Sequence, residues 1–527
     1  YCGPACQKVH WREHKVDCKS ELLKATWRPQ WEADGRKPRF MGGDPLVAFN
    51  STGKYLWGNI PAYDVVNLTR NEGLDAEEDL NLLFAASGDL RNVFKTIHGV
   101  PPTYGGDISI VLNDKDLHTV ARNAITLLLL LLDDDTERAA RNALHLWYSA
   151  FIPESLMDKM REDVGRAIEN VCIKVENKHP DTLLGKTFDF GQRRLRLTLQ
   201  QRAWMSLRQY LQVPQISLQD AQERRKAVTL APERIDHRER SFLSQEPGRR
   251  FCAFKFREHG ILLPFASVWD SFTIPNPTIF GKEGTWPMKD SADPLEGWPV
   301  ADVRRSSGAA ENDIYVKLYY YVLDLLTSVH RLLGKLKISF ELFNTDAQEL
   351  TKYCKDVQFD RIETANIADG GYLGPARTVC LLGNLLRPPW CNPHATLITL
   401  FMNAISEVTT AADEQAEAAK ELRLAMKYLH PTPIPSMYDA DMLRVAANKE
   451  SLRDFDKYFD RYIHKNRFQE FCDFMQMEMK SQNTIIDKWP LRLKKRYGQP
   501  GALEEFKELM GSGSVGSARY VEWRYRR

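Results

Sequence analysis

The pattern of apolar and polar positions first indicates a strand, a turn and a helix between Asp79 and Ile97. A short apolar run over residues 81–84 precedes four small residues at 85–88, and apolar positions then recur at helical spacing. We expect Asp89 to be the N-cap of that helix. The small side chains would let a ligand or another strand approach the turn closely. Such turns open cofactor-binding α/β domains, and also many α/β domains that bind nothing.

The same alternation of strand and helix continues along the chain. We expect strands over residues 108–112, 337–343, 359–366 and 394–402, with helices over 117–132 and 377–386. Strands joined by helices form a parallel sheet, so the fold class is α/β. The core is then built from two pieces of chain, residues 55–132 and 331–410.

The remaining segments are predicted to be mainly helical. Residues 133–330 form an insertion that includes alternating basic and apolar positions at 191–213, which we also expect to be helical. A stretch at 276–299 is rich in Pro, Gly and aromatic residues, and we interpret it as a packing strap rather than a lid. Residues 411–527 form a helical C-terminal region whose last ten residues suit an edge strand.

Composition narrows the function classes. The chain has 527 residues, 43% of them hydrophobic, and a net charge of +2, which gives no electrostatic reason to expect nucleic acid or a membrane as a partner. The longest apolar run, residues 125–132, fits a buried helix and is too short to span a bilayer. Scattered cysteines favour a reducing compartment, so we expect a cytoplasmic or nuclear protein. The chain begins at Tyr1 without a visible signal peptide, which suggests a fragment or a processed form.

A cluster of metal-ligating residue types lies at the start of the chain. Residues 1–20 contain C-x3-C-x7-H-x3-C, made by Cys2, Cys6, His14 and Cys18. Thiolate and imidazole groups are the ligands that zinc prefers in a tetrahedral site. A helix would place the last two of these residues on one face. We therefore expect all four to be zinc ligands.

This segment, with Tyr1 before the first cysteine and the run HWREHK, resembles the C-terminal half of a MYND zinc finger. The resemblance implies that Cys2 and Cys6 serve one ion, that His14 and Cys18 serve another, and that an upstream half supplies the other ligands. Because metal binding and folding are coupled in small modules, we expect a helix with incompletely formed sites. MYND modules bind proline-containing peptides, so the resemblance implies a protein partner of that kind. Residues 21–54 are expected to be a linker laid on the next domain.

Five landmarks in order resemble the core of a class I S-adenosylmethionine methyltransferase, a Rossmann-like sheet. The small turn corresponds to the methionine-binding turn, the acid after the second strand to the ribose-binding acid, and the acid after the third strand to the one that holds the adenine amino group. The segments FDRIETAN and LLRPPWCNPHATLITLF correspond to the fourth strand and to the helix and strand that follow. The candidate cofactor residues are Ala86, Ser87, Gly88, Asp89, Asp114 and Asp346.

From the residues alone, Asp114 has two interpretations. It either accepts hydrogen bonds from ribose hydroxyls, or it caps the helix that begins at Leu117 and solvates the strand end.

The whole chain resembles MYND-finger proteins that carry a domain of unknown function shared with dynein axonemal assembly factors. The segments WGNIPAYDVV, LLFAASGDLRNV, WPMKDSADPLEGW, FDRIETANIAD and NPHATLITLFMNA carry this resemblance.

The sequence departs from active methyltransferases at several points. The turn has one glycine, no acidic residue begins it, and no Asn/Asp-Pro-Pro-Tyr motif follows the fourth strand, so no catalytic residue is nominated. We therefore expect a protein-interaction or assembly adaptor with a methyltransferase-like domain as its scaffold. The alternative is an S-adenosylmethionine-dependent methyltransferase of unknown acceptor, because methyl transfer to a nucleophile depends on alignment more than on acid–base chemistry.

Overall fold

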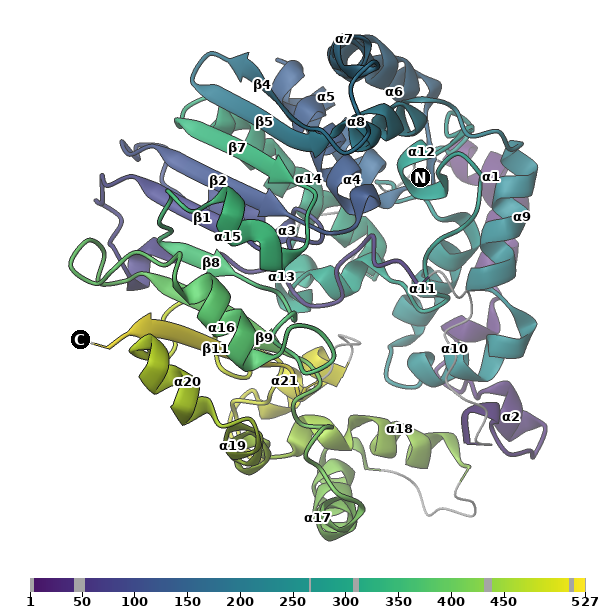
Figure 1. The fold of residues 1–527 in the computed structure, drawn as a ribbon. Coiled ribbons are helices and arrows are strands. Elements are labelled where there is room, and N and C mark those ends of the chain that lie inside the picture. The colour runs from purple at the N-terminus through teal and green to yellow at the C-terminus, as the bar shows by residue number, and fades with distance from the viewer. Residues whose placement is uncertain are drawn as a thin grey trace.

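A nine-stranded sheet runs through the molecule, in the order β10-β11-β9-β8-β1-β2-β7-β5-β4 (Figure 1). The computed structural model describes residues 4–41, 53–264, 267–306, 312–430, 438–510 and 516–526. The strands of the sheet are β1 (Leu80–Phe84), β2 (Ile108–Asn113), β4 (Leu183–Phe190), β5 (Arg193–Gln200), β7 (Ile338–Phe343), β8 (Arg361–Glu363), β9 (Thr396–Phe401), β10 (Met477–Met479) and β11 (Arg519–Tyr525).

The centre of the sheet is parallel and both of its edges are antiparallel. β5, β7, β2, β1, β8 and β9 pair in parallel, whereas β4 pairs antiparallel with β5, and β11 pairs antiparallel with both β9 and β10. The order reverses beside β1, with β2 and β7 on one side and β8 and β9 on the other. The prediction that two distant pieces of chain form one sheet is therefore confirmed. Such a reversal leaves a crevice at the carboxyl ends of the strands, where α/β proteins bind ligands.

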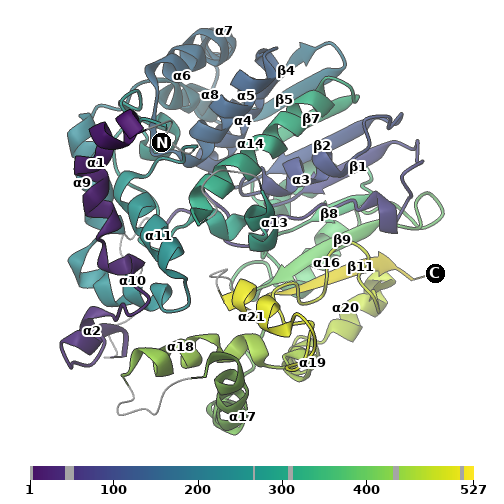
Figure 2. The ribbon, with the colours of Figure 1, turned by 180° about the vertical axis from the view of Figure 1, so that it is seen from behind.

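Helices cover both faces of the sheet (Figures 1 and 2). Strand residues alternate between two apolar clusters, so that Leu82 and Phe84 enter one cluster while Leu83 enters the other. One face is covered by α3 (Arg91–Gly99), α4 (Leu117–Leu132), α5 (Thr136–Tyr148) and α14 (Ile314–Leu333). The other is covered by α15 (Leu350–Tyr353), α16 (Pro375–Gly383), α19 (Asp456–Lys465) and α20 (Phe468–Met475).

The region between β2 and β7 is mainly helical, as expected. Besides α4, α5, α14 and the β4–β5 hairpin, it contains β3 (Phe151–Ile152), α6 (Glu154–Lys159), a π-helical turn (Met160–Gly165), α7 (Arg166–Val175), α8 (Gln201–Leu207), α9 (Leu218–Thr229), α10 (Ile235–Phe242), α11 (Pro247–His259), β6 (Ile274–Pro275), α12 (Pro277–Phe280) and α13 (Val300–Arg305). The aromatic stretch at 276–299 is a packing strap, because Phe280, Trp286 and Trp298 are all buried.

The prediction of a helix over residues 191–213 is wrong for the first half of that range. Residues 193–200 form β5, which pairs with β7 in the main sheet. Leu195, Leu197 and Leu199 are buried while Arg194 and Arg196 are exposed, so the alternating pattern has the period of a strand. The helical period begins only at α8.

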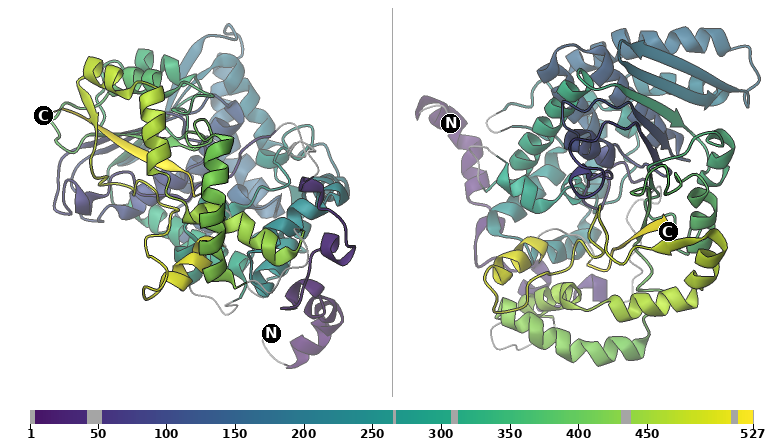
Figure 3. Two further views of the ribbon diagram at one scale, coloured as in Figure 1. Left: turned by 90° about the horizontal axis from the view of Figure 1, so that it is seen from below. Right: turned by 90° about the vertical axis from the view of Figure 1, so that its left-hand side faces the viewer.

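The C-terminal region contains α17 (Ala411–Leu429), α18 (Ala440–Asn448) and α21 (Ala502–Met510), together with α19 and α20. Seen from below, its helices lie across the β11 end of the molecule (Figure 3). The predicted tail strand exists as β11, but its place at the edge was wrong, since β10 pairs outside it. Both of its faces are covered: Tyr520 and Glu522 are buried, and so are Val521 and Trp523.

The N-terminal segment packs on the helical insertion rather than on the sheet. α1 (Pro4–Cys18) is helical as predicted, and its Asp17 lies 3.4 Å from Lys255 of α11. In the linker, Trp31 is fully buried and Arg36 donates two hydrogen bonds to Asp236 of α10, at 2.7 and 2.8 Å. Among the helices in the described ranges, none has the length and apolar character needed to cross a membrane.

Candidate functional site

The small-residue turn follows β1 directly, beside the point at which the strand order reverses. Gly88 has a φ of 53°, in the left-handed region that favours glycine. The helix begins later than predicted, at Arg91, and its N-cap is Leu90. Asp89 lies one residue before this N-cap, and its Oδ1 accepts the backbone N–H of Arg91 at 3.3 Å. Its carboxylate also pairs with the Arg91 side chain, Oδ1 to Nε 2.6 Å, and accepts the Gly58 amide at 2.9 Å.

Asp114 follows β2, and its carboxylate is already bonded within the protein. It accepts a hydrogen bond from the backbone N–H of Gly88 at 3.1 Å and one from that of Asp116 at 2.9 Å. Its pKa is raised by burial. The interpretation of Asp114 as a helix cap is wrong, because Asp116 caps α4 by accepting from the His118 amide. The predicted ribose acid and the predicted methionine-binding turn are thus bonded to each other.

Asp346 follows β7 at the same end of the sheet. Its side chain accepts from the Gln348 amide at 2.9 Å. The Asn344 side chain donates to the backbone carbonyl of Asp114 at 3.0 Å, which joins the two loops. Asp346 lines an open cavity of about 450 Å³ together with Lys115, Asn344 and residues of α8. The structure therefore brings the three predicted positions to one end of the sheet.

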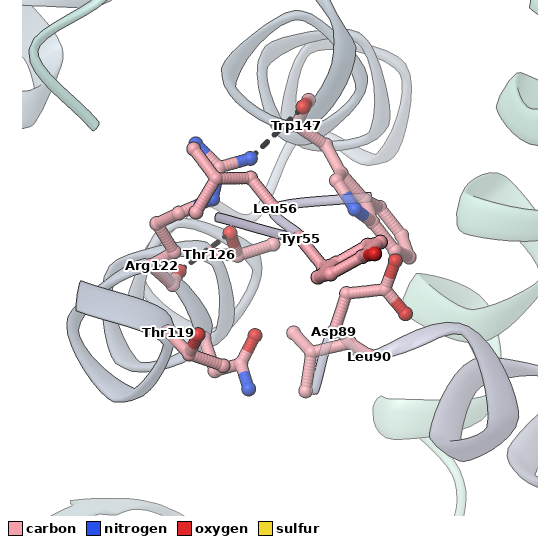
Figure 4. Close-up of a pocket in the computed structure, with 9 residues that line it drawn as sticks. Tyr55, Leu56, Asp89, Leu90, Thr119, Arg122, Thr126 and Trp147 are labelled. Carbon is pink, nitrogen blue, oxygen red and sulfur yellow. Dashed lines mark hydrogen bonds between the residues drawn. The ribbon is translucent and has the colours of Figure 1, made fainter. Parts of the chain in front are cut away.

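Asp89 lines a different and much smaller cavity (Figure 4). Its volume is about 10 Å³, enough for about one water molecule. Arg122 lies on its wall and is committed to the protein, donating to the backbone carbonyls of Trp147 at 2.9 Å and Thr278 at 2.8 Å. Burial lowers the pKa of Arg122 to about 10. Asp114 lines neither this cavity nor the one beside Asp346.

The space beside the turn is filled by two segments from elsewhere in the chain, residues 55–60 and the packing strap. The partly buried Arg91 links them, because its guanidinium donates to the carbonyl oxygens of Ile60 and of Gly297. A Cβ at Gly58 would overlap this guanidinium, and one at Gly297 would lie 2.8 Å from the Arg91 Cδ, so both glycines permit the close approach. Arg91 was not predicted from the sequence as a residue of the site. The one feature of the sequence that could have indicated Arg91 is a basic residue directly after Asp89-Leu90, close to the small-residue turn.

Glu363, at the carboxyl end of β8, is a second residue of this region that was not predicted from the sequence. It is 4% exposed and accepts the Ala365 amide at 2.9 Å. Burial raises the pKa of Glu363 to about 7, while the Ala365 amide, the charge of Arg91 and the Tyr63 hydroxyl act in the opposite direction. Its acidic side chain at the end of an apolar strand was the available signal.

The described groups fit S-adenosylmethionine poorly at the turn. A bound methionine would need the N–H of Gly88 and space beside Asp89, and both are used by the protein itself. The cavity beside Asp346 has room for a nucleoside-sized group.

The predicted zinc ligands fall mostly outside the described residues. Cys2 is not described, nor are the side chains of Cys6 and His14, and Cys18 is exposed at the end of α1. In the described part of the chain, no group of three or more His, Cys, Asp or Glu residues is arranged to hold a metal. Zinc binding by these four residues stays a prediction.

Comparison with known proteins places one part of the chain in a class. Residues 56–152, which span β1, the turn, β2, α4 and α5, match a domain of unknown function, DUF4470. The chain is also similar to dynein axonemal assembly factor 3 from Danio rerio, with 25% identity over 119 residues. That match covers 23% of this chain and 24% of the relative. No solved structure matches the chain.

Proposed function

We propose that the protein is an adaptor that assists the assembly of other proteins, and that its sheet domain is a scaffold. The main support is that the polar groups of the turn are bonded within the protein. Asp114 accepts a hydrogen bond from the Gly88 amide, Asp89 accepts one from the Gly58 amide, and Arg91 donates to the covering segments. The partial similarity to a dynein axonemal assembly factor fits an assembly-type role.

The strand order supports the resemblance to a methyltransferase core. Part of the sheet resembles that of class I methyltransferases: the strand order β7-β2-β1-β8-β9-β11-β10, with β11 antiparallel to both of its neighbours. The β4–β5 hairpin extends this sheet beyond β7. The same order and the cavity beside Asp346 favour the second candidate function, an S-adenosylmethionine-dependent methyltransferase.

The two functions are separated by titrating S-adenosylmethionine and S-adenosylhomocysteine into the full chain by calorimetry. The scaffold function predicts no binding up to about 1 mM ligand. Binding that is lost in both Asp114→Ala and Asp346→Ala would overturn it in favour of the enzyme.

We further propose that the N-terminal segment, with zinc held by Cys2, Cys6, His14 and Cys18, binds a proline-containing peptide. The position of α1 on the outside of the helical insertion supports this role (Figure 2). Fluorescence anisotropy of a labelled proline-rich peptide, with and without zinc, tests it on the full chain. Binding that persists in Cys6→Ser or without zinc would contradict the proposal.

A further inference from the structure

A polar cavity lies between the helical insertion and the C-terminal region, and no residue of the turn after β1 lines it. It has a volume of about 450 Å³, within the range of small-molecule sites. Its walls come from α10, α11, the packing strap, α18 and α21 (Figure 2). The Asn448 side chain of α18 donates to Ser244 Oγ at 2.7 Å and joins two of these walls. The cavity is therefore built by segments that are distant in sequence.

Arginine dominates the walls of this cavity. Five arginines and one histidine line it, against three carboxyl side chains: Arg234, Arg238, Arg240, Arg249, Arg257 and His237, with Asp290, Asp293 and Glu296. Arg234 is paired with Asp290, Nε to Oδ2 2.8 Å. Within the described ranges, no ion pair closer than 4 Å is present for the other four arginines.

Arg249 carries the strongest indication of a ligand. It is 8% exposed, and its buried Nη1 has no hydrogen-bond partner. A buried cationic nitrogen without an acceptor is costly, and its desolvation lowers the pKa of Arg249. Burial also lowers the pKa of Arg238, whose guanidinium makes one long bond of 3.4 Å to a backbone carbonyl. An anion in the cavity would satisfy both groups.

The carboxyl groups of the cavity do not cancel this charge. Asp290 is neutralised by Arg234, and Asp293 accepts the Tyr315 hydroxyl at 2.7 Å. Burial raises the pKa of Glu296 to about 8, so that it is largely protonated at neutral pH. The cavity thus has an excess of about three positive charges, which a diphosphate group would balance.

Two acceptors in the same walls point to hydroxyl groups on the ligand. Asp290 Oδ1 and Gln245 Oε1 are buried and have no hydrogen-bond partner. A sugar hydroxyl donates to such oxygens, whereas inorganic phosphate offers mainly acceptors.

We propose that this cavity binds a small molecule that carries a diphosphate and sugar hydroxyls, with a nucleoside diphosphate as the representative ligand. Arg238, Arg249 and Arg257 hold the phosphates, and Asp290 and Gln245 accept from the hydroxyls. This site shares no lining residue with the turn after β1 and does not depend on the assembly role.

Calorimetry on the full chain tests the proposal with ADP, pyrophosphate and adenosine at one fixed ionic strength. We expect one site for ADP, weaker binding of pyrophosphate and no binding of adenosine. Arg249→Met should weaken ADP at least tenfold, and Arg238→Gln should do the same if the first variant does not fold. The matched control Arg194→Gln, exposed on the β4–β5 hairpin, should bind as the wild type does.

Several results would overturn the site. One is the absence of ADP and pyrophosphate binding at about 5 mM ligand. Another is an ADP affinity that is unchanged in both arginine variants, and a third is adenosine binding as tight as that of ADP. Equal affinity for pyrophosphate and ADP would show that the nucleoside part adds nothing to binding, and would exclude nucleoside diphosphates as the ligand class. ADP binding lost in Asp114→Ala would place the ligand at the sheet instead.

Discussion

Single residues at the carboxyl ends of the strands decide how the crevice is used. Asp114, Asp89 and Glu363 each accept backbone N–H groups of the chain itself. Side chains of this type bind the hydroxyl and amino groups of cofactors in related sheets. Here they order the loops around β1.

Asp114→Ala should lower the free energy of unfolding by about 1–3 kcal/mol, because two backbone donors lose their partly buried acceptor. Urea denaturation measures this change. The control Asp107→Ala removes an exposed carboxylate near the other end of β2 and should change stability by about 0.5 kcal/mol or less. Equal effects of the two substitutions would contradict the role of Asp114.

Glu363→Gln should change the pH dependence of stability. The pKa of Glu363 is about 7 in the folded protein, above its ordinary value of 4.5, so the folded state holds the proton more tightly than the unfolded state. Its contribution is fully present below about pH 4.5 and is lost as pH rises to about 7. The loss amounts to about 3 kcal/mol.

Urea denaturation between pH 5 and pH 8 measures this effect as the difference between Glu363→Gln and the wild type. The variant should become more stable than the wild type by a margin that grows with pH and levels off above about pH 7. The difference removes the contribution of other buried acids such as Asp369, whose pKa burial raises to about 6. A difference that does not change with pH would contradict the assignment.

At the scale of elements, the periodicity of apolar residues predicted those strands and helices that have a clear local pattern. The strands β1, β2, β7 and β9 and the helix α4 were predicted nearly at their observed bounds, because each has a clear period. The sequence also placed Gly88, Asp114 and Asp346 near one end of the sheet. It missed Arg91, Glu363 and the covering segment 55–60, because these depend on contacts between segments distant in sequence.

The β4–β5 hairpin shows why one element was misassigned. Its apolar residues alternate with arginines, and the leucines become informative only when β7 is known to lie beside them. Leu197→Ala should therefore cost about 2–5 kcal/mol, as a buried leucine in the core does. Arg194→Ala on the exposed face should cost about 0.5 kcal/mol or less. Chemical denaturation measures the loss of unfolding free energy in each variant. Similar losses in Leu197→Ala and Arg194→Ala would contradict the assignment of β5 as a strand with one buried face.

At the scale of the molecule, one buried ion pair joins the β8 and β9 region to the segment before β1. Arg361 is fully buried and donates to Glu72 at 2.7 Å, and Glu72 also accepts from Asn392. Glu72→Ala would leave the guanidinium buried without its carboxylate, at a cost of about 3–5 kcal/mol. Thermal unfolding measures the loss, and the exposed Glu77→Ala is the control. A melting temperature unchanged by Glu72→Ala would show that the pair is not needed.

The interior place of β11 has a consequence for biosynthesis. The strand between β9 and β10 is supplied by residues 519–525, so the edge of β9 stays uncovered until these residues have left the ribosome. An uncovered strand with the apolar sequence TLITLF invites pairing with other nascent chains. The protein should therefore depend on chaperones during translation, and premature termination before residue 519 should yield aggregates rather than a smaller folded domain.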